Sequence, residues 1–456
     1  MNRIAPKTQR PFNPSRWVGA LSILLVGFVI ALAVAAALAP ALLPAGDRVN
    51  AESRSVAVGA IFVGSYLALA IGRIPGLSID RAGIALVGAS LMVASGALSL
   101  EEAYKAVDLD TITLLLGMMI VVANLRLSGF FAIANAWVMV HAKRPFVLLA
   151  AVIATSGVFS AFLVNDAICL VLTPLVLKLT LALRRQPAPY LLAIAMASNV
   201  GSTATITGNP QNIMIGSFSH IPYAKFALVL GPVALVGLII TWAIIALLHR
   251  AEFAGTVRLE APLPNIDANR ALVIRALLAT FSLIALFFAG VLPAKAAVVI
   301  GSLLLLTRRV KSRRVYREID WSLLLMFTGL FIIVAGAQHA LLGADIIAAV
   351  GQFHLDQAPS LTIVTAVLSN LVSNVPAVLM LKPFIDALKD HDTAWLVTAM
   401  ASTLAGNFTV VGSIANLIVV QGAATAGVAI GFWDYFRVGA PLTVITLAFG
   451  ALWLWL

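Results

Sequence analysis

Long apolar runs, separated by short polar or charged connections, alternate along the chain. A helix needs about 20 apolar residues to cross a bilayer, and only helices or closed barrels can span one. The runs therefore predict an all-α polytopic membrane protein with about eleven transmembrane helices. Their expected positions are 17–43, 56–72, 82–99, 110–140, 189–218, 224–248, 271–290, 295–307, 320–350, 394–420 and 432–456.

Two further apolar stretches, 145–177 and 359–385, are too long for one comfortable crossing and too short for two. Each has a polar dip at its centre, LVND in the first and VSNVP in the second. Basic residues flank both ends of the first stretch, whereas acidic or mixed segments flank both ends of the second. Lys and Arg gather on the cytoplasmic side of membrane proteins. Both ends of the first stretch should therefore be cytoplasmic, and both ends of the second should be external. We predict two re-entrant hairpins, one entering from each face.

Positive charge sets the predicted orientation. Only 11% of the residues are charged, against about 25% in soluble domains, and the net charge is +11. A basic balance can indicate nucleic-acid binding, but here Lys and Arg gather in segments such as RRVKSRR (308–314), between spans on one side. We therefore predict a cell (inner) membrane protein with a cytoplasmic N-terminus, an external C-terminus and no nucleic-acid partner. The first run, 17–43, is too long for a signal peptide and is interpreted as a true helix.

A polar island interrupts the apolar sequence at ASNVGSTATITGNPQNIMIG (197–216). Its Gly, Pro, Asn and Gln residues break helices, and polar groups of this kind are costly in hydrocarbon. A matching island lies in the second half of the chain. We predict that 199–212 and 403–416 are unwound breaks in two membrane helices, buried in protein or lining a wet cavity.

The two islands belong to an internal repeat. LLAIAMASNVGSTATITGNPQNIMIG (191–216) aligns without a gap with WLVTAMASTLAGNFTVVGSIANLIVV (395–420), and NDAICLVLTP (165–174) aligns with NVPAVLMLKP (374–383). The copies start on opposite sides in the predicted topology, which is the pattern of an inverted-topology repeat. The expected divisions are an N-terminus with the first helix (1–55), the first repeat (56–250), a cytoplasmic linker (251–270) and the second repeat (271–456).

The hairpin NDAICLVLTP, the break GNPQN, the second hairpin SNVPAVLM and the terminal DYFRVGAPLT resemble the ion transporter superfamily. Within it, the pattern is similar to arsenite permeases and silicon efflux transporters, and more distantly to the divalent-anion/sodium symporters. The resemblance covers roughly residues 55–456. The sodium-coupled dicarboxylate symporters carry Ser-Asn-Thr at both hairpin tips, whereas this chain has Val-Asn-Asp and Ser-Asn-Val.

The resemblance implies that hairpin tips and helix breaks hold the substrate and a coupling ion, either a proton or sodium. The substrate-binding residues it implies are Asn165, Asp166, Ser202, Thr203, Thr205, Asn209, Gln211, Asn374, Thr409 and Ser413. The coupling-ion residues it implies are Asp166, Asn165, Gly208, Asn212, Ser373, Asn374, Gly412 and Asn416.

Asp166 is the only carboxylate near the centre of a predicted span. An ionisable side chain at membrane depth indicates function, and a proton carrier is the role that suits it. The alternative is a structural carboxylate that caps a half-helix. For the Asn residues at tips and breaks, ligand contact and satisfaction of open backbone groups are both expected. Arg126 either pairs with a break or with Asp166 at the site, or forms a structural ion pair, and the sequence leaves both alternatives open. Lys382 is expected to extend toward the interface rather than to bind an anion.

We predict a secondary active transporter that moves a small anion or weak oxyacid, either arsenite- or silicate-like or a carboxylate, by alternating access. The alternatives are a sodium/proton antiporter of the same fold and a passive anion channel. No nucleophile–base set, phosphate loop or metal-ligand cluster occurs, and the single Cys169 excludes an intramolecular disulfide. An enzyme, a cofactor and a metal are therefore not expected. The expected partners are the substrate and the lipid bilayer, and homodimer formation is left open.

Overall fold

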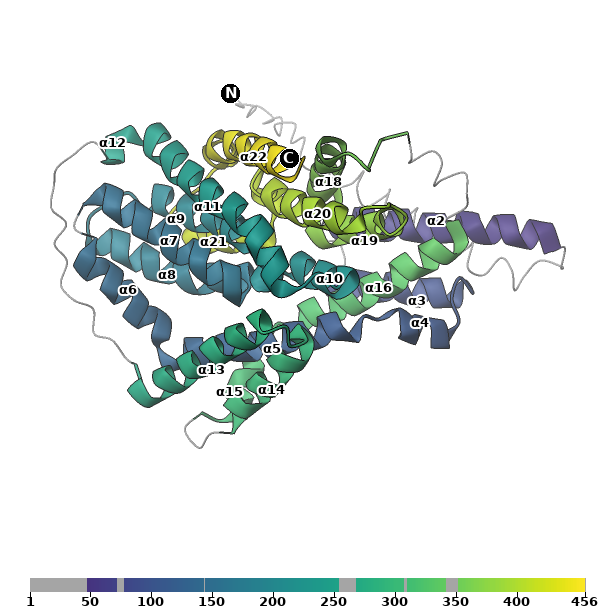
Figure 1. The fold of residues 1–456 in the computed structure, drawn as a ribbon, viewed down its shortest axis with the longest axis horizontal. Coiled ribbons are helices and arrows are strands. Elements are labelled where there is room, and N and C mark those ends of the chain that lie inside the picture. Colours follow the sequence, from purple (N-terminus) through teal and green to yellow (C-terminus); the bar gives the residue numbers. More distant parts are fainter. Residues whose placement is uncertain are drawn as a thin grey trace, which may run out of the picture. The chain divides into compact units, whose positions relative to one another are not determined.

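The computed structural model describes residues 47–71, 78–142, 144–253, 268–306, 310–341 and 352–455. Over these residues the secondary structure is helical, without a strand, which confirms the all-α class (Figure 1). The helices are α2 (Asp47–Ile71), α3 (Arg81–Ala94), α4 (Leu100–Ala106), α5 (Leu109–Ser128), α6 (Phe130–His141), α7 (Pro145–Leu163), α8 (Asn165–Ala182), α9 (Pro187–Ser202), η1 (Ile206–Gly208), α10 (Pro210–Ser219), α11 (Tyr223–Leu248), α12 (Arg250–Phe253), α13 (Arg270–Phe288), α14 (Pro293–Leu305), α15 (Ser312–Arg317), α16 (Trp321–Leu341), α18 (Ala358–Val372), α19 (Asn374–Ile385), α20 (His391–Ala405), η2 (Val410–Gly412), α21 (Ile414–Thr425) and α22 (Phe432–Trp455).

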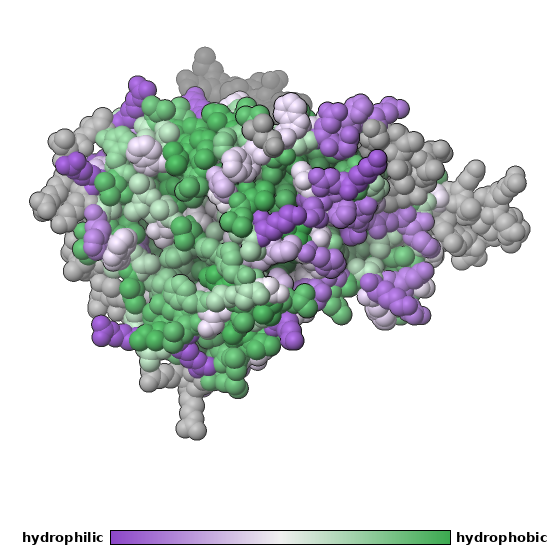
Figure 2. All heavy atoms as spheres, in the orientation of Figure 1, coloured by the Kyte–Doolittle hydropathy of each residue, from purple (hydrophilic) through white to green (hydrophobic). Residues whose placement is uncertain are grey.

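Seven of the described helices are long and apolar enough to cross a membrane: α5, α7, α8, α11, α13, α16 and α22. Shorter apolar helices accompany them, so the number of crossings stays a prediction. The predicted helix 17–43, and residues 342–350 of the predicted span 320–350, lie outside the described residues. Figure 2 shows a face that is mostly apolar over α11 and α13, where Leu228 and Phe281 are 75% and 65% exposed. Apolar exposure of this extent is what lipid contact requires.

The chain divides into two compact units. The first unit contains residues 1–106 and 325–342, and the second contains residues 107–324 and 343–456. Both predicted hairpins and both predicted breaks lie in the second unit, so a single unit holds the candidate site. The sequence-based divisions at 55, 250 and 270 stay predictions.

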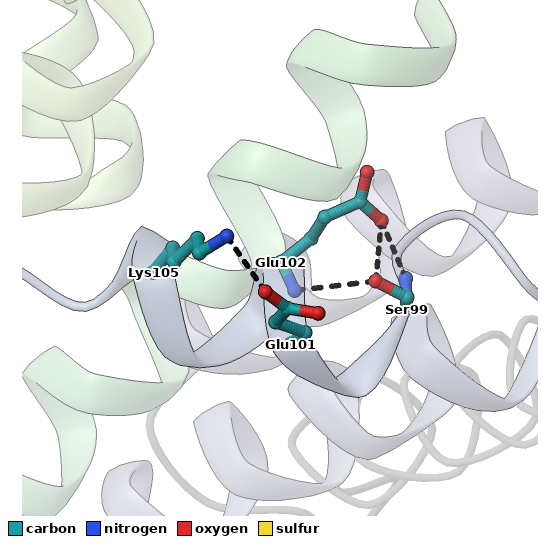
Figure 3. A network of polar contacts seen from close by, with 4 residues as sticks. All are labelled: Ser99, Glu101, Glu102 and Lys105. Carbon is teal, nitrogen blue, oxygen red and sulfur yellow. Dashed lines mark hydrogen bonds and ion pairs between the residues drawn. The ribbon is translucent and has the colours of Figure 1, made fainter.

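In the first unit, the turn before α4 shows how the sequence caps a short helix (Figure 3). The backbone N–H of Ser99 donates to Glu102 Oε2 at 2.7 Å, and the N–H of Glu102 donates to Ser99 Oγ at 3.2 Å. This reciprocal pair is a capping box. Hydrogen bonds from Ser99 lower the pKa of the Glu102 carboxyl because they stabilise its ionised form. One turn on, Lys105 and Glu101 form an exposed ion pair at 2.8 Å.

Each predicted hairpin reverses at a single residue. Val164, with φ of 63°, is the only residue between α7 and α8, and Ser373, with φ of 80°, is the only residue between α18 and α19. A positive φ is unusual for a β-branched residue such as Val, and it turns the chain sharply enough for the two helices to pack together. Both reversals fall in the polar dips of the sequence, so the two hairpins are confirmed. Their re-entrant path in the membrane stays a prediction.

The re-entrant path predicts that Arg144, before α7, and Arg184, after α8, lie on the same cytoplasmic side. Single cysteines at these two positions, in a Cys169→Ala chain, should both react with a membrane-impermeant thiol reagent in inside-out vesicles. Neither should react in right-side-out vesicles. Reaction of the two positions from opposite faces would show that the segment between them crosses the membrane once and does not return to its own side, and the inverted repeat would then lose its basis.

Both predicted breaks are present but shorter than predicted, at 203–209 instead of 199–212 and at 406–413 instead of 403–416. In the first, α9 ends at Ser202, a single 3₁₀ turn (η1) follows, and α10 begins at Pro210. In the second, α20, η2 and α21 repeat this order. The backbone conformations also repeat, since Thr205 and its aligned partner Thr409 have φ/ψ of −140°/163° and −136°/164°. The repeat found in the sequence is therefore a repeat of local structure.

One predicted helix is wrong in its continuity. The span 110–140 is divided at Gly129 into α5 and α6. Gly129 has φ of 86°, a left-handed conformation that ends a helix and that glycine adopts without strain. The signal was present in the sequence as Asn124, Arg126 and Ser128 followed by Gly129, but the long apolar runs on both sides were joined into one span.

Candidate functional site

The two helix breaks contact each other reciprocally through short polar side chains. Asn199 of α9 donates from Nδ2 to Asn416 Oδ1 at 3.0 Å. Thr403 of α20 donates from Oγ1 to Asn212 Oδ1 at 3.4 Å. In the repeat alignment Asn199 corresponds to Thr403 and Asn212 corresponds to Asn416. The first of these two aligned positions in each copy therefore contacts the second position in the other copy.

A second pair of contacts obeys the same rule. Ser413 Oγ donates to Asn199 Oδ1 at 3.1 Å, and Asn209 Nδ2, at the aligned position, donates to Thr403 Oγ1 at 3.0 Å. Reciprocal contacts of this kind are what a two-fold axis produces. The polar side chains of the breaks thus form one cluster around a local pseudo-two-fold axis, which we call the amide network.

Each break is held open by its own asparagine. Asn212 donates from Nδ2 to the carbonyls of Ser202 and Thr205, both at 3.1 Å. Asn416 makes the two equivalent contacts in the second break, at 2.7 and 3.1 Å. The carbonyls of Ser202 and Gly406 stand at the ends of half-helices, where backbone acceptors lack helical partners, whereas those of Thr205 and Thr409 also accept from the N–H groups of Gly208 and Gly412. The structural role considered from the sequence therefore accounts for the nitrogens of both amides.

The hairpin tips reach the same network. Asn165, the first residue of α8, donates from Nδ2 to Asn199 Oδ1 at 3.0 Å. Asn374, the first residue of α19, lies with its Nδ2 3.2 Å from the carbonyl of Gly412 and its Oδ1 3.2 Å from Gln211 Nε2. Asn374 thus contacts both breaks, and the predicted convergence of tips and breaks is confirmed.

Close packing of α7 against α9 brings the first hairpin to the first break. These helices lie side by side in Figure 1, with α8 and α21 next to them. A Cβ at Gly201 would overlap the backbone of Gly157, so only glycine permits this approach. The hydroxyl of Thr205 donates to the carbonyl of Ala161 in α7. The hairpin and the break are therefore positioned as one piece.

Several buried oxygens around the network find no hydrogen-bond partner among the described residues. They include Ser160 Oγ and Asn165 Oδ1 on the first hairpin, and Thr365 Oγ1 and Asn370 Oδ1 on the second. Asn370 uses its nitrogen on the carbonyl of Ala405, at 3.0 Å, at the edge of the second break. A buried oxygen without a donor costs free energy that a bound ligand or water recovers.

The network carries no charged side chain among its described members, so helix ends supply its electrostatic field. Half-helix N-termini favour anions and C-termini favour cations. Both kinds of end meet here, in equal number. The N-termini are those of α8, α10, α19 and α21, and the C-termini are those of α7, α9, α18 and α20.

Asp166 does not join the network. It follows Asn165 in the first turn of α8 and instead lines a separate cavity with Arg126, Glu318 and Asp320. No hydrogen bond or ion pair reaches Asp166 from the described part of the chain. Of the two alternatives for Arg126, pairing with Asp166 or a break is wrong and an ion pair elsewhere is found, because Arg126 Nη1 lies 2.7 Å from Glu318 Oε2.

The other predicted site residues have distinct positions. Lys382 forms an ion pair with Asp386 at 2.6 Å and lies over the ring of Phe218, as expected for a side chain that extends toward the interface. Ser373 contributes the hairpin turn, and Thr409 contributes a backbone carbonyl. The predicted residues that the structure brings together in the network are Asn165, Ser202, Thr203, Thr205, Gly208, Asn209, Gln211, Asn212, Asn374, Gly412, Ser413 and Asn416.

Sequence reasoning missed several members of the network. Asn199 and Thr403 are the first residues of the predicted breaks 199–212 and 403–416, but they lie in the last turns of α9 and α20 and were not among the predicted binding residues. Ser369 and Asn370 lay outside every predicted set, whereas Asn407 lay inside the second predicted break. The useful signal was the alignment, because polar residues occupy the positions of Asn199 and Thr403 in both copies.

An apolar, all-helical fold whose two broken helices and two hairpin tips meet in one buried polar network defines a multi-pass membrane transporter. The fold is similar to the crystal structure of the YdaH transporter of Alcanivorax borkumensis, with a TM-score of 0.54 and 14% sequence identity. That similarity covers 88% of this chain and 97% of the other.

The family described as citrate transporter, CitMHS, matches residues 66–405, well over half of the 456 residues, and the chain belongs to this family. An uncharacterized transporter of Mycobacterium tuberculosis is 29% identical over 437 residues, which cover 88% of this chain and 98% of the relative. The silicon efflux transporter LSI3 of Oryza sativa is 27% identical, covering 87% and 96%. The resemblance to permeases of the ion transporter superfamily is confirmed.

Proposed function

We propose that this protein is a secondary active transporter that carries a small anion or weak oxyacid, of the silicate, arsenite or carboxylate type, by alternating access. The observation that carries the proposal is the meeting of four half-helix N-termini with neutral amide and hydroxyl side chains in one buried network. Such a network suits a small ligand with several oxygens. Backbone N–H groups donate hydrogen bonds to its charged oxygens, and the amide and hydroxyl side chains bind its hydroxyl groups.

Within this range, the charge of the network favours a weak oxyacid over a dicarboxylate. The described network contains no Lys or Arg, so a dianion would have only helix dipoles to compensate it. Burial of a charge without a partner is costly, whereas a protonated oxyacid both donates and accepts hydrogen bonds. The oxygens of Asn165 and Ser160, which lack donors, suit the hydroxyl groups of such an acid. The name of LSI3 points to the same substrate class.

The coupling ion is proposed to be a proton carried by Asp166. The carboxylate sits at the hairpin tip, next to Asn165 in the sequence, and it faces a cavity rather than the network. A group in this position exchanges protons with water while its neighbour contacts the site. Oxygens without donors also suit a sodium ion, so a sodium/proton antiporter is the second candidate.

Binding and flux together test the proposed function. Silicic acid, arsenous acid or citrate should stabilise the purified protein, by about 2.7 kcal/mol at a hundred times its Kd. In proteoliposomes the same compound should accumulate against its gradient when a pH or sodium gradient is imposed. Asn374→Ala should weaken the stabilisation, whereas Thr280→Ala, a buried hydroxyl in α13 outside the network, should leave it unchanged. Flux that only ever runs downhill would support a channel and contradict the proposal.

A further inference from the structure

A cavity of about 130 Å³ lies beside the tip of the first hairpin, within the second unit. We call it the tip cavity. Its walls come from α5, α8, the corner between α15 and α16, and α21, which continues directly from the second break. It is lined by apolar side chains except on one side, where four charged residues gather. The lining includes Arg126, Asp166, Ala167, Glu318, Asp320 and Ile414.

The charges of the tip cavity do not balance. Arg126, in the last turn of α5, is its only cation among the described lining residues, and Glu318 neutralises it at 2.7 Å. Asp166 and Asp320 remain, both carboxylates and neither with a cationic partner. Asp320 accepts a hydrogen bond from the N–H of Leu323 at 3.0 Å, which fixes it at the start of α16. The cavity therefore combines one compensated ion pair with two uncompensated negative charges.

The other lining residues of the described chain add no positive charge; Arg313, Arg314 and Arg317 of α15 precede the corner but do not line the cavity. The side chains that α21 contributes to the cavity are apolar, Ile414 among them. On α8, one turn beyond Asp166, the thiol of Cys169 is buried and donates to Ser198 Oγ at 3.0 Å. Low-dielectric walls around charges of one sign focus their field into the space between them. The tip cavity should attract cations and repel anions.

We propose that the tip cavity is the access route by which the coupling proton, as hydronium, reaches Asp166, and that Asp320 makes this route selective against anions. This inference rests on the proposed function, because it names the path and the selectivity of the same hairpin tip. Asp320 acts here as a positioning residue that concentrates cations near Asp166. The Arg126–Glu318 pair sets the balance, since loss of Glu318 would leave Arg126 uncompensated. An anionic substrate must reach the network by another path.

Charge-selective labelling tests the route without any transport. The probe is a cysteine at Ala167 in a Cys169→Ala chain, treated with a cationic and, separately, an anionic methanethiosulfonate of similar size. Relative to free cysteine, the cationic reagent should react faster than the anionic one by about tenfold, because the thiol would line the same cavity as the two carboxylates without cationic partners. Asp320→Asn and Glu318→Gln should each lower this ratio by about threefold.

A second cavity supplies the matched control. It is lined by residues that include Asp110, Ser217, His220 and Lys295, so its charges are close to balance. A cysteine at Ser217 should show the ratio of free cysteine, and Asp320→Asn should leave that ratio unchanged. Equal ratios at positions 167 and 217, or a ratio at 167 that does not respond to Asp320→Asn, would overturn the inference. The labelling needs neither substrate nor gradient, so it succeeds or fails independently of the proposed function.

Transport then tests the role of Asp320. Asp320→Asn should lower flux driven by a pH gradient by about threefold, the factor expected for the loss of one nearby charge. It should leave substrate-for-substrate exchange at equal pH unchanged, and Asp320→Glu should restore proton-driven flux. Thermal melting of each variant confirms folding. If exchange falls as much as proton-driven flux, or if Asp320→Glu is as defective as Asp320→Asn, the residue is only structural and the inference is wrong.

Discussion

Replacing Asp166 by Asn should abolish flux driven by a pH gradient while exchange of substrate at equal pH continues. An amide has nearly the shape of a protonated carboxyl group, so Asp166→Asn imitates the permanently protonated state. Asp166 lines the tip cavity and makes no hydrogen bond to the described network, so the amide network should persist in the variant. A side chain that cannot ionise cannot release a proton on the other side. The measurement is flux into proteoliposomes under an imposed pH gradient and, separately, under a sodium gradient.

Two other outcomes are distinct from this one. If Asp166 has only a structural role, the variant should fold poorly, or the surviving protein should keep the pH dependence of the wild type. If sodium is the coupling ion, sodium-driven flux should be lost without any effect of pH. A well-folded Asp166→Asn protein with normal proton-driven flux would end the proposal that this residue carries the proton.

Replacing Asn199 by Leu should unfold the site and destabilise the protein by about 3 kcal/mol. The side chain of Asn199 makes four hydrogen bonds, each within 3.1 Å. Its Nδ2 donates to Asn407 and Asn416, and its Oδ1 accepts from Asn165 and Ser413. Leu has a similar volume but leaves four buried polar groups without this partner. Hydrogen bonds between membrane helices average less than 1 kcal/mol, but here four are lost together.

The internal repeat supplies a control for this variant. Thr403 occupies the aligned position in the second copy and contacts the other break through its hydroxyl. Asn199→Thr keeps a donor and an acceptor in place, so it should lose less stability than Asn199→Leu, about half as much. The readout is thermal unfolding in detergent, followed by transport of whichever variants remain folded. Equal melting temperatures for Asn199→Leu and the wild type would show that the reciprocal contacts contribute nothing to stability.

The sequence predicted the hairpins and the breaks because polar residues within an apolar run must be buried in protein or line a wet cavity. The reversals at Val164 and Ser373 fall inside the polar dips, and η1 and η2 fall inside the polar islands. The end of α5 at Gly129 was missed because the polar residues before it are isolated among apolar ones, and the apolar runs on both sides were taken as one helix.

Side-chain direction was the other limit. Asn165 and Asp166 are neighbours in the chain, and both were placed in one site. Successive residues on a helix point about 100° apart, so the first turn of α8 aims Asn165 at the network and Asp166 at the cavity. Which face of the turn meets which neighbour depends on the packing of distant helices. The pairing of Arg126 with Glu318, which are 192 positions apart, depends on the same packing.

The reciprocal contacts of the amide network also bear on the ancestry of the chain. If the two hairpins enter from opposite faces, as predicted, two identical halves would present the same tip to both faces of the membrane. In the present chain, the position of Asp166 on one tip is occupied by Val375, a buried apolar residue, on the other. Divergence between the halves therefore includes the one position at which an ionisable side chain stands on a hairpin tip.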